Sequence, residues 1–328
     1  MNLLDRYDAV LLDLDGTVYR GEHVIDAAPA AVEAAHRAGI TVRFVTNNAS
    51  RTPADVAGHL TDIGIPADAA EVSTSAQAAA TVLAERLAGN DRGTVLVVGA
   101  PALEREVELA GLTSTRTASD DVVAVAQGLS RDTGWRDLAE ACLAINAGAL
   151  WVACNVDPTL PTERGQLPGN GSFVAALRTA TGKEPVIAGK PAAPLMIEAI
   201  RTADAGNALA VGDRLDTDIE GAVAAGIDSL LVLTGVTTAA ELLAADTRPT
   251  YLAADLAALT EPADRLAIGD QPDWSVDAGT ITHLGTGEPD TTSLLRALAA
   301  QKPGTRFTAA DDGARAALAH LGLDDELA

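Results

Sequence analysis

Short apolar runs alternate with longer segments that carry helix start and stop signals, and this alternation restricts the fold more than any other feature. The apolar run Ala9–Leu12 is followed by an Ala-rich segment, Ala27–Ala38, that ends at Gly39, and then by the β-rich run Thr41–Val45. Parallel strands buried on both faces are unbroken apolar runs, and parallel neighbours need a crossover that is usually helical. The pattern therefore predicts a doubly wound parallel sheet of the α/β class.

The alternation begins afresh near residue 76 and later returns to the first set. The second set has expected strands at Thr94–Val98, Val122–Ala126 and Ala149–Ala153, and expected helices at Ala76–Leu87 behind a Ser75 cap, Ala102–Ala110, Trp135–Ala147 and Phe173–Thr181. The first sheet is expected to resume with Pro185–Ala188, Asn207–Val211 and Leu230–Leu233. We therefore predict a core of residues 1–75 and 185–261, with a second α/β unit, residues 76–184, inserted into it.

Two helix starts and one long loop can be placed from local signals. Thr52, Pro53 and Asp55 suit the cap and the first turn of a helix. Thr217 and Glu220 fit a capping box for the helix that ends at Gly226. The stretch 154–170 is rich in Pro and Gly and is interpreted as a long loop, a kind of segment that is usually functional or disordered.

The composition changes after Pro262, and residues 262–328 are expected to form a small α+β extension. Trp274–Asp277 and Thr280–Thr282 are suited to a hairpin, and helices are expected over Thr292–Ala300 and Ala309–Leu321. The extension contains no motif that indicates chemistry.

The charge balance excludes broad classes of partner. The chain has 46 acidic and 23 basic residues and a net charge of -23, which argues against general binding to nucleic acid or to an anionic membrane. Neither a signal-peptide pattern nor an apolar run of about 20 residues is present. Cys142 and Cys154 have no metal-type spacing and suit the reduced thiols of a cytosolic protein. We therefore expect a cytoplasmic protein.

The segment from Asp13 to Thr17 has the strongest chemical signal. Asp13 and Asp15 directly follow the first apolar run, and a two-residue step places both on one side of an extended backbone. Two such carboxylates repel unless a cation lies between them or one is protonated, and Mg²⁺ prefers oxygen ligands. The pair suits an Asp that attacks phosphorus and an Asp that moves the proton. An ordinary turn is the alternative.

Polar residues follow three further expected strands. Thr46, Asn47 and Asn48 could cradle a phosphate with a hydroxyl and main-chain N–H groups, or simply form a capped turn. Lys190 is one of only three lysines and could supply a compact positive charge, or be a solvated loop residue. Because ligands gather at the carboxyl ends of parallel strands, the shared position of these clusters favours a site.

The last cluster is acidic. Asp213 could complete an oxygen-ligand set for Mg²⁺. Asp218 could orient a metal-bound water, or interact with a helix dipole. Asp216 and Thr217 are interpreted as helix-capping groups.

Taken in order, these four clusters resemble the haloacid dehalogenase superfamily of phosphotransferases over roughly residues 8–255. The inserted unit resembles the C2-type cap of the NagD-like (IIA) subfamily. The segments 46–50, 212–219 and 233–236 of the predicted core also resemble that subfamily. The stretch 155–165, together with the extension, is most similar to the bacterial D,L-glycerol-3-phosphate phosphatases of that subfamily.

The resemblance implies a role for each residue. Asp13 would be the nucleophile, and Asp15 the general acid and base. Mg²⁺ would be held by Asp13, the main-chain carbonyl of Asp15 and Asp213, with Asp218 just outside. Thr46, Asn47, Asn48 and Lys190 would hold the phosphoryl group, and Asn155, Asp157 and the loop 158–164 of the cap would recognise the leaving group.

We therefore expect a Mg²⁺-dependent phosphomonoesterase for glycerol 3-phosphate or a similar small polyol phosphate. Phosphoglycolate, sugar phosphates, nucleotides and 4-nitrophenyl phosphate are alternative substrates, and a phosphomutase is not separated from them by the core motifs. A receiver-like domain phosphorylated on Asp is the non-enzymatic alternative. A homo-oligomer formed through the cap or the extension is left open.

Overall fold

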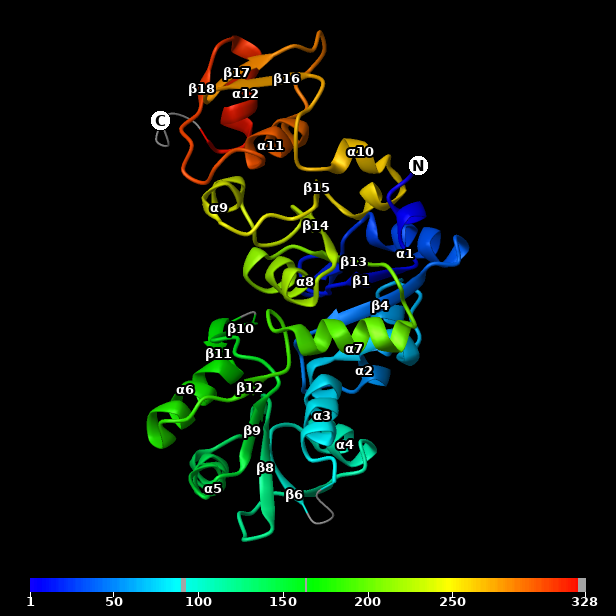
Figure 1. Ribbon diagram of the computed structural model, residues 1–328. Coiled ribbons are helices and arrows are strands. Elements are labelled where there is room, and N and C mark those ends of the chain that lie inside the picture. Colours follow the sequence, from blue (N-terminus) through cyan, green and yellow to red (C-terminus); the bar gives the residue numbers. More distant parts are fainter. Residues whose placement is uncertain (90–92, 163, 324–328) are drawn as a thin grey trace. The chain divides into compact units, whose positions relative to one another are not determined.

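The computed structural model describes residues 1–89, 93–162 and 164–323, and the chain divides into two compact units (Figure 1). The first unit consists of Met1–Val42, Ile63–Pro66 and the described part of Ala205–Ala328. The second consists of the described parts of Arg43–Asp62 and Ala67–Asp204. These units do not follow the predicted segments one for one, and the domain boundaries proposed above stay a prediction.

Parallel strands of the first unit form the sheet that carries the acidic residues. They lie in the order β15-β14-β13-β1, with Leu12 opposite Val211 and Val211 opposite Leu230. The strands are β1 (Ala9–Leu12), β13 (Ala208–Gly212), β14 (Asp228–Val232) and β15 (Tyr251–Ala253). The helices beside them are α1 (Ala28–Arg37), α8 (Glu220–Ala225), α9 (Ala239–Ala244) and α10 (Ala263–Leu266). The predicted α/β class is confirmed.

The C-terminal extension shares its apolar core with this sheet. It consists of β16 (Trp274–Asp277), β17 (Thr280–His283), α11 (Thr291–Ala299), β18 (Thr308–Ala309) and α12 (Asp312–His320). The predicted hairpin is present as the antiparallel pair β16–β17. Leu294 and Leu295 of α11 belong to the same buried cluster as Leu231 and Leu252 of the sheet. The Arg296 guanidinium also donates to the Leu252 carbonyl, at 2.7 Å. The extension is therefore packed as part of the first unit.

A second parallel sheet lies in the second unit, with the strand order β12-β9-β8-β6-β7. Its strands are β6 (Thr94–Val98), β7 (Thr113–Thr115), β8 (Val122–Gln127), β9 (Leu150–Ala153) and β12 (Val186–Ile187). The helices α3 (Ser75–Arg86) and α4 (Pro101–Leu109) pack together, as do α5 (Trp135–Asn146) and α6 (Asn170–Thr181). Figure 1 shows the two pairs on opposite sides of the strands. Because β12 pairs with β9, the prediction that Pro185–Ala188 rejoins the first sheet is wrong.

The predicted long loop between β9 and α6 contains a hairpin. The strands β10 (Thr159–Thr162) and β11 (Gly165–Pro168) are antiparallel, with Leu160 opposite Leu167. The Thr162 hydroxyl donates to the Gly165 carbonyl, at 2.7 Å, and so closes the turn. Residue 163, within the predicted substrate-reading loop 158–164, lies outside the described residues.

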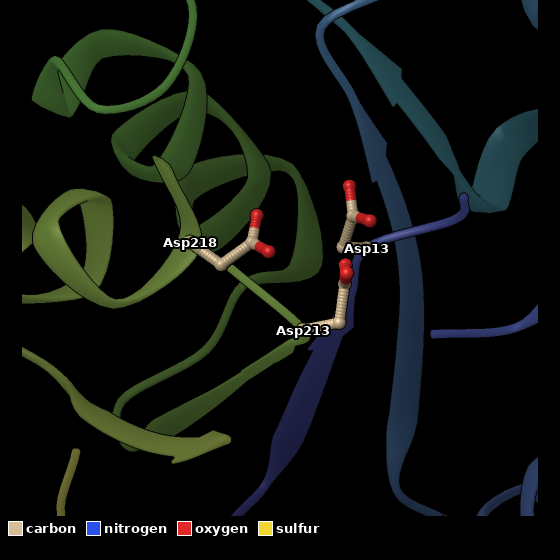
Figure 2. Close-up of side chains that lie close together, drawn as sticks. All are labelled: Asp13, Asp213 and Asp218. Atoms are coloured by element: carbon tan, nitrogen blue, oxygen red, sulfur yellow. The ribbon is translucent and has the colours of Figure 1, made fainter. Parts of the chain in front are cut away.

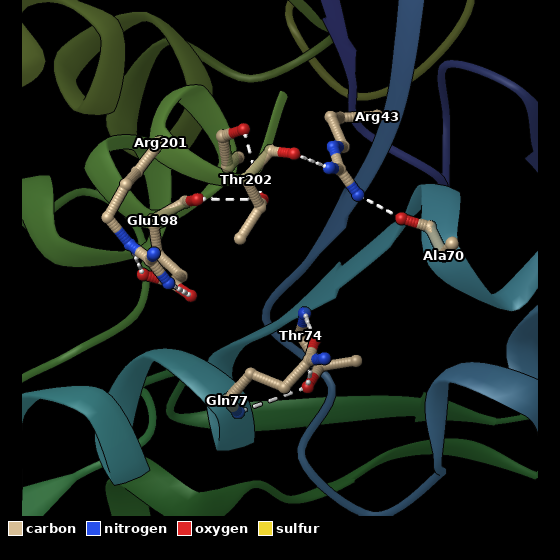
Figure 3. A network of polar contacts seen from close by, with 8 residues as sticks. Arg43, Ala70, Thr74, Gln77, Glu198, Arg201 and Thr202 are labelled. Carbon is tan, nitrogen blue, oxygen red and sulfur yellow. Dashed lines mark hydrogen bonds and ion pairs between the residues drawn. The ribbon is translucent and has the colours of Figure 1, made fainter. Parts of the chain in front are cut away.

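One strand passes from the first unit into the second and is anchored there by an arginine. β4 (Thr41–Thr46) begins in the first unit and pairs with β5 (Val72–Thr74) in the second. The Arg43 guanidinium donates to the carbonyl groups of Ala70 and Thr202, the latter on α7 (Ala193–Ala203) (Figure 3). Burial lowers the pKa of Arg43, and these carbonyls replace its water. The network fixes the strand that leads to Thr46.

The predicted helix caps were right in one case and wrong in two. The Thr52 hydroxyl accepts from the N–H of Asp55 at the start of α2 (Pro53–Asp62), as predicted. Helix α3 is capped by Thr74 through a capping box with Gln77 (Figure 3), whereas the Ser75 hydroxyl donates to the Asn47 carbonyl, at 2.6 Å. The capping box predicted at Thr217 is absent.

A π-helical turn, Leu215–Ile219, precedes α8 in place of that capping box. The Asp216 carboxylate pairs with the Arg214 guanidinium at 2.7 Å, a contact that lowers the pKa of Asp216. Single π-helical turns are frequent at functional sites. None of the described helices combines the length and the apolar character that crossing a bilayer requires.

Candidate active site

Three carboxyl groups of the first unit lie close together. Carboxylate oxygens of Asp13, Asp213 and Asp218 are all within 4.8 Å of one another. Asp13 and Asp213 directly follow β1 and β13, and Asp218 lies in the π-helical turn. Figure 2 shows the Asp213 carboxyl group directed toward Asp13 and the Asp218 carboxyl group directed toward the same space. The carboxyl ends of two parallel strands and one tight turn thus build an acidic centre.

Glycines leave the room that these carboxyl groups occupy. A Cβ atom at Gly235 would lie 1.8 Å from Asp213 Oδ2, and one at Gly16 would lie 2.5 Å from the Asp213 carboxyl carbon. A Cβ atom at Gly212 would lie 2.2 Å from the Cβ of Asp218. Contacts this short do not occur between non-bonded atoms. A side chain at any of these three positions would therefore displace Asp213 or Asp218. The backbone is therefore shaped around the carboxyl groups.

The donor set suits a hard divalent cation. Asp213 is fully buried and Asp218 is 2% exposed, so their charges are poorly screened by water. Two carboxylates within 4.8 Å of each other repel by at least roughly 3 kcal/mol at an effective dielectric constant of about 20. A cation would turn this repulsion into attraction, and carboxylate oxygens are the ligands that Mg²⁺ and Ca²⁺ prefer. Main-chain donors also hold the acids, since Val236 N–H donates to Asp213, at 2.7 Å, and Arg214 N–H to Asp218, at 3.1 Å.

Asp15 has a different environment from the three clustered acids. Its side chain is exposed, and Gly21 N–H lies 3.5 Å from its Oδ1 atom. The main chain turns back directly after it, because Gly16 N–H donates to the Tyr19 carbonyl, at 2.7 Å, with Gly16 in the left-handed region at φ 94°. An accessible carboxyl group two residues after Asp13 suits proton transfer to and from water.

The second unit contains the other predicted residues. Thr46 ends β4 and is 9% exposed, and its hydroxyl oxygen accepts from Asn48 N–H, at 3.1 Å. The exposed Asn48 side chain accepts in turn from the N–H and the hydroxyl of Ser50, both at 2.8 Å. These bonds form a tight turn after β4, in which the Asn48 side chain has a local structural role.

Lys190 is buried, and its main chain is held by Asn47. Its side chain is 2% exposed, and its ammonium lies 3.4 Å from the Val45 carbonyl. The Asn47 carboxamide accepts from the Lys190 N–H, at 2.8 Å, and donates to the Lys190 carbonyl, at 3.0 Å. The structure therefore brings together two motifs that are 143 positions apart in the sequence.

The predicted cap residues Asn155 and Asp157 belong to the same network. The buried Asn155 amide donates to the Asn47 carbonyl, at 2.7 Å, and the Asp157 carboxylate accepts from the Asn47 amide, at 3.3 Å. Sequence reasoning missed Asn170, whose buried amide donates to the Asn155 carbonyl, at 2.7 Å. It also missed Ser75 as a partner of Asn47. Neither residue has a sequence signal beyond its position at a helix start.

The hairpin β10–β11 lines a cavity of about 670 Å³ in the second unit. Arg131 and Arg164 line it together with apolar side chains, among them Leu160, Leu167 and Phe173. Two guanidinium groups in one cavity favour an anionic or polar occupant. The predicted substrate-reading loop thus borders a space that could hold a small molecule.

The sequence can now be placed in a family. A model of haloacid dehalogenase-like hydrolases matches residues 10–113, and a second, HAD-hydrolase-like model matches residues 187–259. Together the two matches cover the segments that contain Asp13, Lys190 and Asp213. The chain belongs to the haloacid dehalogenase-like hydrolase family.

Within the family, the chain is similar to characterised phosphatases. It is 49% identical to D-glycerol 3-phosphate phosphatase of Mycobacterium tuberculosis over 98% of this chain and 96% of that protein. It is 39% identical to the 5'-nucleotidase YutF of Bacillus subtilis over 75% of this chain and 94% of that protein. A crystal structure of glycerol phosphate phosphatase from M. tuberculosis in complex with magnesium matches with a TM-score of 0.92 at 49% identity, over 98% of this chain and 99% of that chain. The predicted resemblance to NagD-like phosphatases is confirmed.

Proposed function

We propose that this protein is a Mg²⁺-dependent phosphomonoesterase that hydrolyses glycerol 3-phosphate or a similar small polyol phosphate. The observation that carries the proposal is the convergence of Asp13 and Asp213, at the ends of neighbouring parallel strands, with Asp218 in the π-helical turn. The nearly full-length similarity to D-glycerol 3-phosphate phosphatase of M. tuberculosis supports the substrate class. Asp13 and Asp213 are the side chains that would hold the metal, together with the main-chain carbonyl of Asp15. Asp218, whose carboxylate lies within 4.8 Å of both, would orient a metal-bound water.

In the first half-reaction, an oxygen of the Asp13 carboxylate attacks the phosphorus atom of the ester. A phosphorus–oxygen bond forms to Asp13, and the bond between phosphorus and the ester oxygen breaks. Asp15 gives its proton to the departing alkoxide, which leaves as glycerol. Bound Mg²⁺ supplies positive charge that offsets the negative charge of the phosphoryl oxygens and of the clustered carboxylates.

In the second half-reaction, the Asp15 carboxylate takes a proton from water as the water oxygen attacks the phosphorus atom. The bond between phosphorus and Asp13 then breaks, and inorganic phosphate leaves. Both active carboxyl groups return to their starting protonation states, so the cycle is balanced.

Thr46 and Lys190 are assigned to the phosphoryl group. A hydroxyl donor and a buried ammonium would stabilise the charge on its oxygens as the bonds to phosphorus change. The cavity beside the hairpin β10–β11 is assigned to the leaving group. Asn155 and Asp157 stay predicted to recognise it. These roles and the metal set are predictions for which the hydrogen bonds and burial given above are the support.

A panel of phosphate esters tests the proposal. Glycerol 3-phosphate, phosphoglycolate, a sugar phosphate, a 5'-mononucleotide and 4-nitrophenyl phosphate are assayed with Mg²⁺ and with EDTA. The proposal expects the highest kcat/KM for glycerol 3-phosphate and no turnover in EDTA. Equal turnover in EDTA would overturn it, and a higher kcat/KM for the nucleotide would favour the activity for which the B. subtilis relative is named.

The receiver-like alternative has its own signature. A chain that accepts phosphate on Asp13 without releasing it would accumulate a stable aspartyl-phosphate, which mass spectrometry would detect. The cytoplasmic location and a homo-oligomer formed through the cap or the extension stay predictions.

A further inference from the structure

The amide group of Asn47 is engaged on both sides by the main chain of Lys190. Its oxygen accepts from the Lys190 N–H, at 2.8 Å, and its nitrogen donates to the Lys190 carbonyl, at 3.0 Å. A planar carboxamide that bonds the donor and the acceptor of one residue fixes both the position and the rotation of that segment of backbone. The side chain that leaves this backbone is the buried ammonium-bearing chain of Lys190.

The neighbouring residue is shaped to allow this contact. A Cβ atom at Gly189 would lie 2.5 Å from Asn47 Oδ1 and 2.4 Å from the Cys154 carbonyl oxygen. A glycine is therefore needed for Asn47 to reach the Lys190 backbone at all. The contact between the Asn47 carboxamide and the Lys190 main chain (the Asn47–Lys190 clamp) therefore explains why a glycine directly precedes the lysine.

The same amide also reaches the cap segment. The second hydrogen of Asn47 Nδ2 can serve Asp157, whose carboxylate lies 3.3 Å away. The Asn47 carbonyl accepts from the Asn155 amide, at 2.7 Å, and the Asn155 carbonyl accepts from the Asn170 amide, at 2.7 Å. The side chain and the main chain of Asn47 thus connect Lys190, the residue predicted to bind phosphate, to the Asn155–Asp157 segment, which is predicted to recognise the leaving group.

We infer that Asn47 is a positioning residue: its carboxamide holds the main chain of Lys190 in register with the Asn155–Asp157 segment, so that the ammonium is set before substrate arrives. The inference rests on the proposed function and revises the part of it that gives the Asn47 side chain a direct contact with phosphate. The carboxamide makes its contacts within the protein, and its effect on turnover passes through Lys190.

Two substitutions separate this role from others. Asn47→Ala removes both bonds to Lys190. Asn47→Asp keeps the shape and accepts from the Lys190 N–H, but an ionised carboxylate faces the Lys190 carbonyl and the Asp157 carboxylate without a donor. Because misplacement of a reacting group by about 1 Å costs roughly 100-fold, both variants should lose about that factor in kcat/KM near neutral pH.

The pH dependence gives a signature that a general structural defect would not. When the carboxyl group introduced by Asn47→Asp is protonated, its O–H can donate to the Lys190 carbonyl and its other oxygen can accept from the Lys190 N–H. It then restores both bonds to Lys190, although not the bond to Asp157. The Asp157 carboxylate and the Lys190 carbonyl raise the pKa of such a group, whereas the Lys190 N–H lowers it. With two oxygen neighbours against one donor, we expect the group to gain its proton within the range of an assay. The activity of Asn47→Asp relative to the natural protein should rise about tenfold or more as pH falls from about 8 to about 5, whereas the relative activity of Asn47→Ala should stay constant.

A readout without turnover completes the test. In Asn47→Ala, the Lys190 amide proton should exchange with solvent at least about tenfold faster, since it loses its acceptor. Asn146→Asp, which makes the same change on an exposed Asn of α5, is the matched control and should alter neither exchange nor activity. Unchanged Lys190 exchange in Asn47→Ala, or a relative activity of Asn47→Asp that is independent of pH, would overturn the inference. A natural protein that hydrolyses no ester, yet shows the faster Lys190 exchange in Asn47→Ala, would overturn the proposed function and leave the clamp standing.

Discussion

Asp13 and Asp213 stand side by side because β1 and β13 are parallel and pair with Leu12 opposite Val211. The Asp13 N–H donates to the Val211 carbonyl, at 2.8 Å, so the pairing continues up to the first acid. A shift of one residue in this register would move one carboxyl group to the other face of the sheet. The acidic centre is therefore specified by strand pairing.

The substitution Asp13→Asn should abolish turnover while leaving the fold intact. The amide oxygen of Asn is a poor nucleophile, and loss of a covalent nucleophile lowers kcat by about 10⁴-fold or more. Phosphate release measures kcat, circular dichroism checks the fold, and calorimetry measures binding of inorganic phosphate. Undiminished hydrolysis by Asp13→Asn would remove Asp13 from the mechanism.

Asp213→Asn should weaken Mg²⁺ binding, so that the variant needs more Mg²⁺ for the same activity. The substitution removes one negative charge from a buried ligand set, and we expect the Mg²⁺ concentration for half-maximal activity to rise at least about tenfold. The control is Asp216→Asn, three residues further on, where the carboxylate pairs with Arg214 outside the cluster. If both variants need the same Mg²⁺ concentration as the natural protein, Asp213 is not a ligand.

Truncation at Pro262 should destabilise the first unit and not merely remove an accessory module. It would expose Leu231, Leu242 and Leu252, which are completely buried. A milder test is Leu295→Ala, which should lower the free energy of unfolding by about 2–5 kcal/mol. Leu284→Ala, at a side chain that is 58% exposed, should change it by less than about 0.5 kcal/mol. Urea denaturation compares the two, and equal effects would contradict the shared core.

Asp311 should contribute stability that is lost in acid. Hydrogen bonds from the N–H groups of Ala314 and His283, each at 2.8 Å, lower its pKa from 3.8. A lowered pKa in the folded state means that the contribution is complete above the unfolded-state pKa and disappears as pH falls through the folded-state pKa. The difference in unfolding free energy between the natural protein and Asp311→Asn should therefore be constant from about pH 7 to about pH 5 and shrink below pH 3.8. A difference that is independent of pH would show that the charge does not matter.

The two thiols should differ in reactivity. Cys154 is fully buried, and burial raises its pKa to about 12, so it is uncharged near neutral pH. Cys142 is only partly buried. An aromatic disulfide reagent should titrate one thiol in the native protein and two after denaturation. Rapid reaction of both in the native state would be evidence against the packing around Cys154.

Strand-end reasoning singled out Asp13 and Asp213 because each directly follows a strand that is a short apolar run in the sequence. Asp13 follows an unbroken apolar run, and Lys190 is conspicuous in a chain that has 23 basic residues but almost no lysine. Pairings that need three-dimensional information were not recovered. The two-residue strand β12 is too short to have a periodicity, so its neighbour could not be inferred, and Pro161 and Pro168 obscured the hairpin β10–β11.

The role of Asn47 shows the same limit. Its type and its place after β4 are typical both of a phosphate-binding turn and of an ordinary one. Its partners are Lys190, 143 positions away, and Asn155, 108 positions away. Contacts of that range leave no local pattern in one sequence, and only the folded chain shows that the carboxamide is engaged by backbone.

The absent side chains at positions 16, 212 and 235 limit how this protein can diversify over generations. Even a methyl group there would collide with an acid, at 1.8 Å in the case of Gly235, so random changes at these sites should be purged together with activity. The side chains of β10 and β11 are exposed or half-buried, so most substitutions there meet no such obstacle, apart from Gly165 at φ 108°. Directed evolution toward hydrolysis of a new ester should therefore select substitutions in that hairpin, while Gly16, Gly212 and Gly235 stay unchanged.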